Sequence, residues 1–165
     1  MVAQNVEKRT SKIELHVPKF EELCFRQKLY SDLETMNYGD SPFDFSVVQW
    51  QAWFDKWVKN PKDRFYAYLI DKETGKPVGD VNYHYDEQLY EFMIGVVILG
   101  ECRGRGFAQD GLKLLCEKAK TDGIKKLCNL IPKNRESAIY IHKKFGFVQL
   151  CDKETESAVF LEKSL

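Results

Sequence analysis

The stretch 96–108 (Val-Val-Ile-Leu-Gly-Glu-Cys-Arg-Gly-Arg-Gly-Phe-Ala) constrains the fold more than any other part of the chain. It begins with an apolar, mostly β-branched run ending at Leu99, which predicts a buried strand. Gly104 and Gly106 then remove Cβ atoms where the backbone must bend or approach a ligand closely. From Phe107 the apolar residues recur at helical spacing. The stretch therefore predicts a strand, a glycine-containing turn and the start of a helix.

A helix start of this kind offers an anion-binding site, because its first N–H groups have no partner within the helix and the helix dipole is positive there. We hypothesise that a pyrophosphate binds to the amides of residues 104–108. The alternative is an ordinary strand–turn–helix connection. A Walker A loop is excluded because no Lys-Ser or Lys-Thr follows the second glycine, and a dinucleotide fingerprint is excluded by the Gly-x-Gly spacing and the lack of an early βαβ unit.

The loop resembles the acyl-CoA loop of the GCN5-related N-acetyltransferase (GNAT) superfamily. That family's signature, Arg/Gln-x-x-Gly-x-Gly/Ala, is matched by Arg103-x-x-Gly106-x-Ala108. A second family signature, Asn-x-x-Ala/Ser-x-x-Leu-Tyr-x-Lys-x-Gly-Phe, is matched over residues 138–147. The chain departs from it at two positions. The family's asparagine position falls on Arg135, with Asn134 one residue earlier, and its tyrosine position is occupied by His142.

The order of predicted elements favours one α/β domain over residues 1–165. Three successive strands joined by tight turns are antiparallel, and the next two connections, through helices, imply a parallel pair. The sequence therefore predicts a GNAT-like mixed, mostly antiparallel sheet of six to seven strands with helices on both faces. Asn134 is predicted to cap the second of these helices. Strands are predicted at residues 13–17, 64–70, 78–85, 89–99, 125–131, 148–152 and 158–162, with helical segments at 20–33, 46–60, 107–122 and 134–145.

Charge and composition limit the classes of partner and the location expected for the chain. The chain carries 25 basic and 25 acidic residues, so no global field favours nucleic acid or an anionic membrane. No apolar run reaches the roughly 18 residues of a membrane-spanning helix, and residues 1–8 show no secretory signal, so a cytoplasmic protein is expected. The five cysteines include no Cys-x-x-Cys pair, which argues against a disulfide framework and against a metal site. The oligomeric state stays open, a homodimer included.

The resemblance implies that acetyl-CoA is the cosubstrate. The main chain of Ile98 and Leu99 would pair with the pantetheine arm as an added strand does, and Asn134 would contact the same arm. The pyrophosphate would be held by the backbone amides of Arg103, Gly104, Arg105, Gly106, Phe107 and Ala108.

The family's reaction, direct acetyl transfer from a thioester to an amine, needs a neutral amine. An alkylammonium group of pKa about 10.4 is neutral only about once in 2,500 molecules at pH 7, so a base is useful. Glu91 is the candidate base, with a solvated strand-end glutamate as the alternative. His84, on the polar side of its strand, is the second candidate. His142 is the candidate acid for the departing thiolate because it stands at the tyrosine position, although a helix histidine also serves structurally.

The acceptor is expected to be the primary amine of a small molecule or peptide. In the loop 37–46, Asp40 and Asp44 form either a gate that attracts a cationic amine or a plain surface connection. Two other classes of function remain open: a non-catalytic acyl-CoA-binding sensor or module on the same fold, and a purely structural interaction domain.

Overall fold

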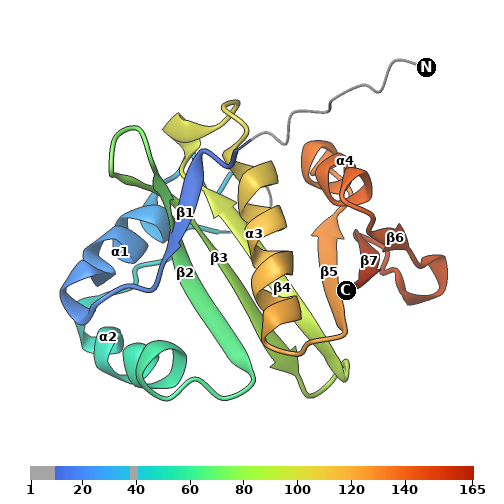
Figure 1. Ribbon diagram of the computed structural model, residues 1–165, viewed down its shortest axis with the longest axis horizontal. Coiled ribbons are helices and arrows are strands. Elements are labelled where there is room, and N and C mark those ends of the chain that lie inside the picture. The colour runs from blue at the N-terminus through green and yellow to red at the C-terminus, as the bar shows by residue number, and fades with distance from the viewer. Residues whose placement is uncertain (1–9, 38–40) are drawn as a thin grey trace.

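The protein folds around one seven-stranded mixed sheet, seen in a computed structural model that describes residues 10–37 and 41–165 (Figure 1). The strand order is β1-β2-β3-β4-β5-β7-β6, and the predicted fold class is confirmed. Asp40, half of the predicted acidic gate, lies outside the described residues. The strands are β1 (Ile13–His16), β2 (Arg64–Asp71), β3 (Pro77–Asp86), β4 (Glu91–Ile98), β5 (Lys126–Pro132), β6 (Val148–Gln149) and β7 (Ala158–Ser164).

Helices cover both faces of the sheet. Residues on alternate positions of a strand face opposite sides, and Leu69 and Val81 pack beneath Gly111 of α3 (Phe107–Thr121), whereas Tyr68 contacts α1 (Leu23–Ser31). The face of the sheet that α1 covers is also covered by α2 (Val47–Phe54), which continues as one π-helical turn, Asp55–Lys59. The helix α4 (Glu136–Lys144) lies beside α3 near β5 (Figure 1).

The strands β4 and β5 run parallel but share a single ladder pair, Met93 with Cys128. The other ladders are longer; β3 and β4, for example, pair from Gly79 with Ile98 to Asp86 with Glu91. Beyond the Met93 pair, the carboxyl-terminal parts of β4 and β5 therefore separate (Figure 1). Residues 94–97 of β4 and 129–132 of β5, which follow this pair, line one cavity.

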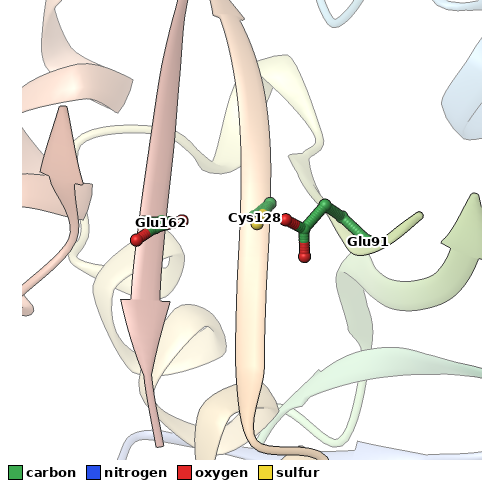
Figure 2. A group of neighbouring side chains, drawn as sticks. All are labelled: Glu91, Cys128 and Glu162. Atoms are coloured by element: carbon green, nitrogen blue, oxygen red, sulfur yellow. The ribbon is translucent and has the colours of Figure 1, made fainter. Parts of the chain in front are cut away.

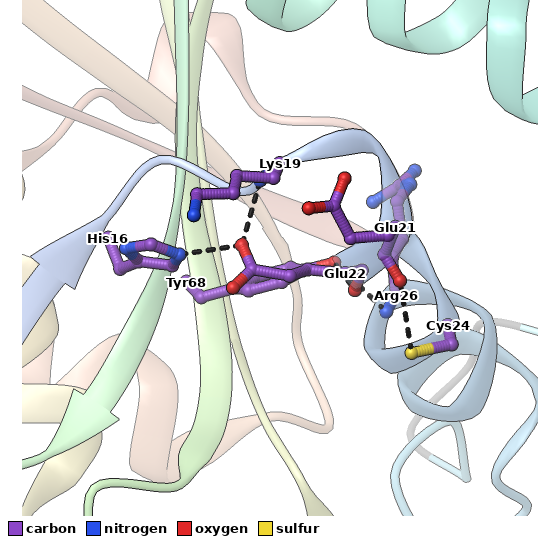
Figure 3. Close-up of polar contacts among 7 residues, drawn as sticks. All are labelled: His16, Lys19, Glu21, Glu22, Cys24, Arg26 and Tyr68. Carbon is purple, nitrogen blue, oxygen red and sulfur yellow. Dashed lines mark hydrogen bonds and ion pairs between the residues drawn. The ribbon is translucent and has the colours of Figure 1, made fainter.

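The start of α1 is tied to β1 and β2 by a chain of hydrogen bonds (Figure 3). The Glu22 carboxylate accepts from the Lys19 backbone N–H at 2.8 Å and lies 2.7 Å from His16 Nε2. These contacts, the backbone bond first, lower the pKa of Glu22. The Tyr68 hydroxyl donates to the Glu22 carbonyl at 2.9 Å and accepts from the Arg26 N–H at 3.2 Å. The helix therefore has a defined starting point on the sheet.

A buried carboxylate, Asp80 on β3, lies beneath α1 and is 0% exposed. It accepts hydrogen bonds from the Tyr66 hydroxyl at 2.5 Å and the Tyr30 hydroxyl at 3.3 Å, and Arg26 Nη1 lies 3.5 Å away. The Arg26 guanidinium in turn lies over the rings of Tyr30, at 4.3 Å, and Trp53, at 4.5 Å. The alternation in β3 predicts an exposed or cleft-facing side for Asp80, and that expectation is wrong at this position because α1 covers it.

The C-terminal elements differ from the prediction in their bounds. Helix α4 begins at Glu136 with Arg135 at the N-cap position, so Asn134 does not cap it. Strand β6 is limited to Val148–Gln149, and a 3₁₀ turn, Cys151–Lys153, follows where more strand was predicted. Within the described residues, no helix has the length and apolar character that crossing a membrane requires.

Candidate active site

A cavity of about 650 Å³ lies between the end of β4, the glycine loop and the start of α4. It contains many of the residues that the sequence assigns to acetyl-CoA, and it adds others from α4. Its lining comprises Val96, Val97, Ile98, Cys102, Arg103, Gly104, Gly106, Phe107, Ala108, Gln109, Asn134, Arg135, Glu136, Ser137, Ala138 and Ile141.

The glycine loop turns through left-handed backbone conformations at Gly104 (φ 75°) and Gly106 (φ 85°), which glycine adopts without strain. Gly106 occupies the N-cap position of α3. Within residues 10–37 and 41–165, the backbone N–H groups of residues 104–108 donate to no protein acceptor. The loop therefore presents a group of available donors at the positive end of a fifteen-residue helix.

The loop is anchored from behind by the turn after α1. The Gly100 N–H donates to Thr35 Oγ1 at 2.9 Å. The Arg103 guanidinium donates to the carbonyls of Glu34, at 3.0 Å, and Thr35, at 2.5 Å. The side chain of Arg103 thus fixes the loop, and its backbone N–H donates to the Gly100 carbonyl at 3.1 Å. The predicted contact of this amide with the pyrophosphate is therefore not supported by this geometry.

The main chain of Leu99 is already occupied. Its N–H donates to the Val78 carbonyl at 2.9 Å, and its carbonyl accepts from the Cys102 N–H at 2.8 Å. The predicted pairing of Leu99 with the pantetheine arm is therefore not supported by this geometry. Ile98 lines the cavity, and its pairing with the arm stays a prediction. The Arg105 side chain is directed away from the cavity, to Asp71 at 3.4 Å.

A second cavity, of about 440 Å³, lies where β4 and β5 diverge. The two cavities share Val96, Val97, Arg135 and Ala138, so a ligand in the first can meet one in the second. Among the described residues that line the second cavity, Arg135 is the only one with a full charge and no carboxylate is present. Its lining otherwise comprises Tyr30, Met36, Ser41, Phe43, Asn82, Ile94, Gly95, Asn129, Leu130, Ile131, Pro132 and His142.

His142 lines the second cavity and is 4% exposed. Its Nδ1 lies 2.7 Å from the Ala138 carbonyl oxygen, and its Nε2 lies 3.0 Å from Asn129 Nδ2. Burial lowers the pKa of the imidazole, with a smaller opposite effect from the Ala138 hydrogen bond. The ring is therefore neutral at pH 7, with both nitrogens engaged.

Comparison with known proteins decides the family: a family model described as "Acetyltransferase (GNAT) domain" matches residues 14–148. The chain belongs to the GNAT acetyltransferase family. It is an N-acetyltransferase, as the signatures around Gly106 and Gly146 predict. A curated relative, spermidine N(1)-acetyltransferase of Escherichia coli K12, is 27% identical over 129 residues, which cover 77% of this chain and 68% of the relative.

Solved structures of GNAT proteins share the fold. Spermidine N-acetyltransferase from Vibrio cholerae, in complex with CoA and spermine, superposes with a TM-score of 0.76 at 16% identity, covering 94% of this chain and 96% of the other. A GNAT superfamily phosphinothricin acetyltransferase from Sinorhizobium meliloti, in complex with AcCoA, gives 0.74 at 16% identity, with 93% and 89% covered. At these identities the likeness concerns the fold alone.

The carboxylate that the sequence proposes as the base of this GNAT enzyme, Glu91, lies at the start of β4 and lines neither cavity. It is held by Lys126 Nζ at 2.6 Å and Lys153 Nζ at 3.4 Å. Figure 2 shows it beside Cys128 and Glu162, and the ligand atoms of the three residues lie within 4.8 Å of one another. The sequence did not predict this group, because its members come from three strands.

The charges of this group are balanced within the protein. Lys126 also lies 3.7 Å from Glu162, so the two lysines supply the positive charge that the carboxylates need. Burial raises the pKa of the Cys128 thiol to about 12, which keeps the thiol protonated and makes it a poor metal ligand. The geometry therefore favours a structural ion-pair cluster at the base of β4 and β5, and the catalytic role of Glu91 stays a prediction.

The Glu91 cluster should make stability depend on pH. Partial burial raises the pKa of Glu91, but the hydrogen bond from Lys126 and the charges of both lysines outweigh it and lower the pKa below 4.5. A carboxylate with a lowered folded-state pKa stabilises the fold above its unfolded pKa and loses that contribution as the pH falls. We expect the free energy of unfolding, measured in urea between about pH 6 and pH 3, to fall less steeply in Glu91→Gln. Equal slopes would contradict the assignment.

His84, the second candidate base, lies on β3 with its ring edge-on to Trp57, 5.8 Å between centroids. It lines neither cavity, and its Nδ1 is buried without a hydrogen-bond partner among the described residues. Burial lowers the pKa of its ring, so the imidazole is neutral at pH 7. Its catalytic role stays a prediction, since the structure places it beside Trp57 of the π-helical turn.

Two carboxamides that line the second cavity, Asn82 and Asn129, were missed by the sequence-based reasoning. The alternation in β3 does place Asn82 on the polar side of its strand, which was the available signal. No comparable signal marks Asn129, because it lies in a short apolar strand and faces the cavity only through the divergence of β4 and β5. The Asn82 side chain packs directly over Gly95, where an added Cβ would lie 2.6 Å from Asn82 Nδ2.

Proposed function

We propose that this protein transfers an acetyl group from acetyl-CoA directly to the primary amine of a small molecule or peptide. The observation that carries the proposal is the row of acceptor-free N–H groups at residues 104–108, at the mouth of a cavity that joins a second one. A pyrophosphate bound there gains several charge-assisted hydrogen bonds and the helix dipole. Solved GNAT structures with AcCoA and with CoA support this choice of cosubstrate.

In this arrangement, the pantetheine arm follows the 650 Å³ cavity along Ile98, and Asn134 at its edge is within reach of the arm. The thioester arrives at the residues that the two cavities share, between β4 and α4. The amine enters through the 440 Å³ cavity and attacks the thioester carbon from the opposite side. Holding the two reactants in line contributes as much as roughly 7–11 kcal/mol to lowering the barrier.

The amine has to lose a proton before or during the attack. No carboxylate lines the acceptor cavity in the described part of the chain, so a water chain to bulk solvent is the route that this lining favours. Glu91→Gln tests the alternative, because a directly acting base would lower turnover by a factor of about 10²–10⁴. An enzyme that relies on water should lose less than about tenfold.

Spermidine is the first acceptor to test, because the curated relative is named for it. The described lining offers aromatic and amide groups in place of acidic ones, so amines that carry one charge belong in the same panel. The experiment is a thiol-release assay with acetyl-CoA and polyamines, aminoglycosides, amino acids and peptides with free N-termini. Turnover with any of them supports the proposal.

The rival function is an acyl-CoA-binding module without catalysis. Calorimetry separates the two possibilities: tight acetyl-CoA binding without turnover across the panel would favour the module. If acetyl-CoA neither binds nor raises the melting temperature, both assignments fail. The oligomeric state, a homodimer included, stays a prediction that light scattering can test.

Gly95 tests the location of the acceptor site. Gly95→Ala places a methyl group 2.6 Å from the present position of Asn82 Nδ2 and forces that side chain into the cavity. We expect the KM for the amine to rise about tenfold, roughly 1.4 kcal/mol, with the Kd for acetyl-CoA unchanged. Adding Asn82→Ala should remove the clash and recover part of the loss. An unchanged amine KM in Gly95→Ala would place the acceptor elsewhere.

A further inference from the structure

The hydrogen bonds of His142 define its tautomer. A carbonyl oxygen can only accept, so the 2.7 Å contact with Ala138 requires a proton on Nδ1. An amide nitrogen can only donate, so the 3.0 Å contact with Asn129 requires a bare Nε2. The two contacts therefore agree on one state, a neutral imidazole with its proton on Nδ1. The ring packs edge-on against Phe147, 5.0 Å between centroids, which holds it in this orientation.

This state leaves His142 without a transferable proton on the side that faces Asn129. A thiolate that leaves the thioester could not take a proton from Nε2, because that nitrogen carries only a lone pair. The lone pair instead holds one of the two Nδ2 protons of Asn129. If the Asn129 carboxamide were flipped, its oxygen would face this lone pair, so the imidazole also fixes which way the amide points.

Asn129 occupies a special place in the sheet. It follows Cys128, whose pairing with Met93 is the one ladder pair between β4 and β5. It is therefore the first β5 residue beyond the point where the two strands separate, and it lines the acceptor cavity. Its second Nδ2 proton is not engaged by the protein in the described residues. Val96 and Val97, further along β4 beyond the Met93 pair, line both this cavity and the one expected to hold acetyl-CoA.

We propose that Asn129 is a catalytic hydrogen-bond donor to the thioester and that His142 is the positioning residue that aims it. The inference rests on the proposed function. When the amine attacks, the C–N bond forms and the carbonyl electrons move to oxygen; when the tetrahedral centre collapses, the C–S bond breaks and its electron pair leaves on sulfur. The amine proton goes to water and the thiolate is protonated from solvent. The N–H of Asn129 stabilises the negative charge without giving up its proton.

Three variants separate this role from acid catalysis by His142. Asn129→Ala should lower kcat about 100-fold, the usual effect of losing one such donor, with the Kd for acetyl-CoA within about twofold of the wild type. His142→Gln offers an oxygen that can accept from Asn129, so kcat should stay within about fivefold of the wild type. His142→Phe offers no acceptor and should lose as much as Asn129→Ala. Lys143→Ala, exposed on the same helix, serves as the control and should retain full activity.

Equal losses in His142→Gln and His142→Phe would overturn the proposal, because an acid cannot be replaced by an amide. The ring nitrogens provide a second readout that needs no substrate. Long-range ¹⁵N–¹H correlation spectra at pH 7 should show protonated Nδ1 and bare Nε2 in the wild type. In Asn129→Asp, the carboxylate should draw a proton onto Nε2 and convert the ring to imidazolium.

The spectra and the activity assay together distinguish a failure of this inference from a failure of the proposed function. A protonated Nε2 in a wild-type enzyme that acetylates amines would overturn this inference and leave the proposed function standing. A bare Nε2 in a protein that acetylates no amine would overturn the proposed function, and the role of Asn129 with it.

Discussion

Gly106→Val is expected to lower the affinity for acetyl-CoA by at least about 100-fold, roughly 2.7 kcal/mol. Gly106 holds a φ of 85°, a conformation that a β-branched residue adopts only with strain. The loop would therefore relax and turn its N–H groups away from the phosphates. The new side chain would also project from a position that lines the 650 Å³ cavity. Isothermal titration calorimetry with acetyl-CoA measures the effect.

Gly123→Val is the matched control. Gly123 has a φ of 83° at the opposite end of α3, where an added Cβ would meet no atom within 4 Å. Both substitutions impose a similar backbone strain, so both should lower stability by roughly 1–3 kcal/mol. Acetyl-CoA affinity should be retained in Gly123→Val. A parallel loss of affinity in both variants would show that the effect comes from strain in α3, and the loop would lose its assigned role.

Arg26→Ala is expected to lower the free energy of unfolding by about 3–5 kcal/mol, because it leaves the fully buried Asp80 without its cation. It also removes the guanidinium that lies over the rings of Tyr30 and Trp53. Urea denaturation followed by tryptophan fluorescence measures the change. The variant should be less affected in acetyl-CoA binding than in stability, because Arg26 lines neither cavity.

The double variant Arg26→Met with Asp80→Asn separates charge from packing. It removes both charges and keeps most of the buried volume, so it should regain a large part of the stability lost in Arg26→Ala. If the double variant is as unstable as the single one, packing and not charge accounts for the loss. A loss below about 1 kcal/mol in Arg26→Ala would contradict the view that the buried Asp80 needs its cationic partner.

The glycine loop and the order of elements could be predicted from the sequence, because both rest on local patterns. Residues 96–108 contain their own strand, turn and helix start, and the glycine positions agree with the positive φ values found there. The alternation of polar and apolar residues along β3 predicts correctly which of them share a face of the sheet. It does not reveal that α1 covers one of them, so Asp80 was expected in an open or cleft-facing position.

The remaining site residues depend on contacts between distant parts of the chain. Asn129 and His142 meet because β5 and α4 pack together, and nothing in either segment alone specifies that contact. Glu91 was proposed as the base from its position on β4, but its lysine partners lie on β5 and in the turn after β6. The predicted pairing of Leu99 with the pantetheine arm has the same weakness, because the Leu99 main chain is hydrogen-bonded to Val78 and to the following turn.

Because Met93–Cys128 is the single ladder pair between β4 and β5, the sheet consists of two parts joined by few backbone hydrogen bonds. One part contains β1 to β4, and the other contains β5 to β7. The ladders between β3 and β4 and between β5 and β7 are long, so fewer backbone hydrogen bonds resist local opening between β4 and β5 than at those two pairings. A ligand bound between β4 and β5 would supply contacts that the missing ladder pairs do not, and would couple the two parts of the sheet. Hydrogen exchange of the β5 backbone amides should then slow when coenzyme A is added, although β5 contributes no residue to the cavity at the glycine loop.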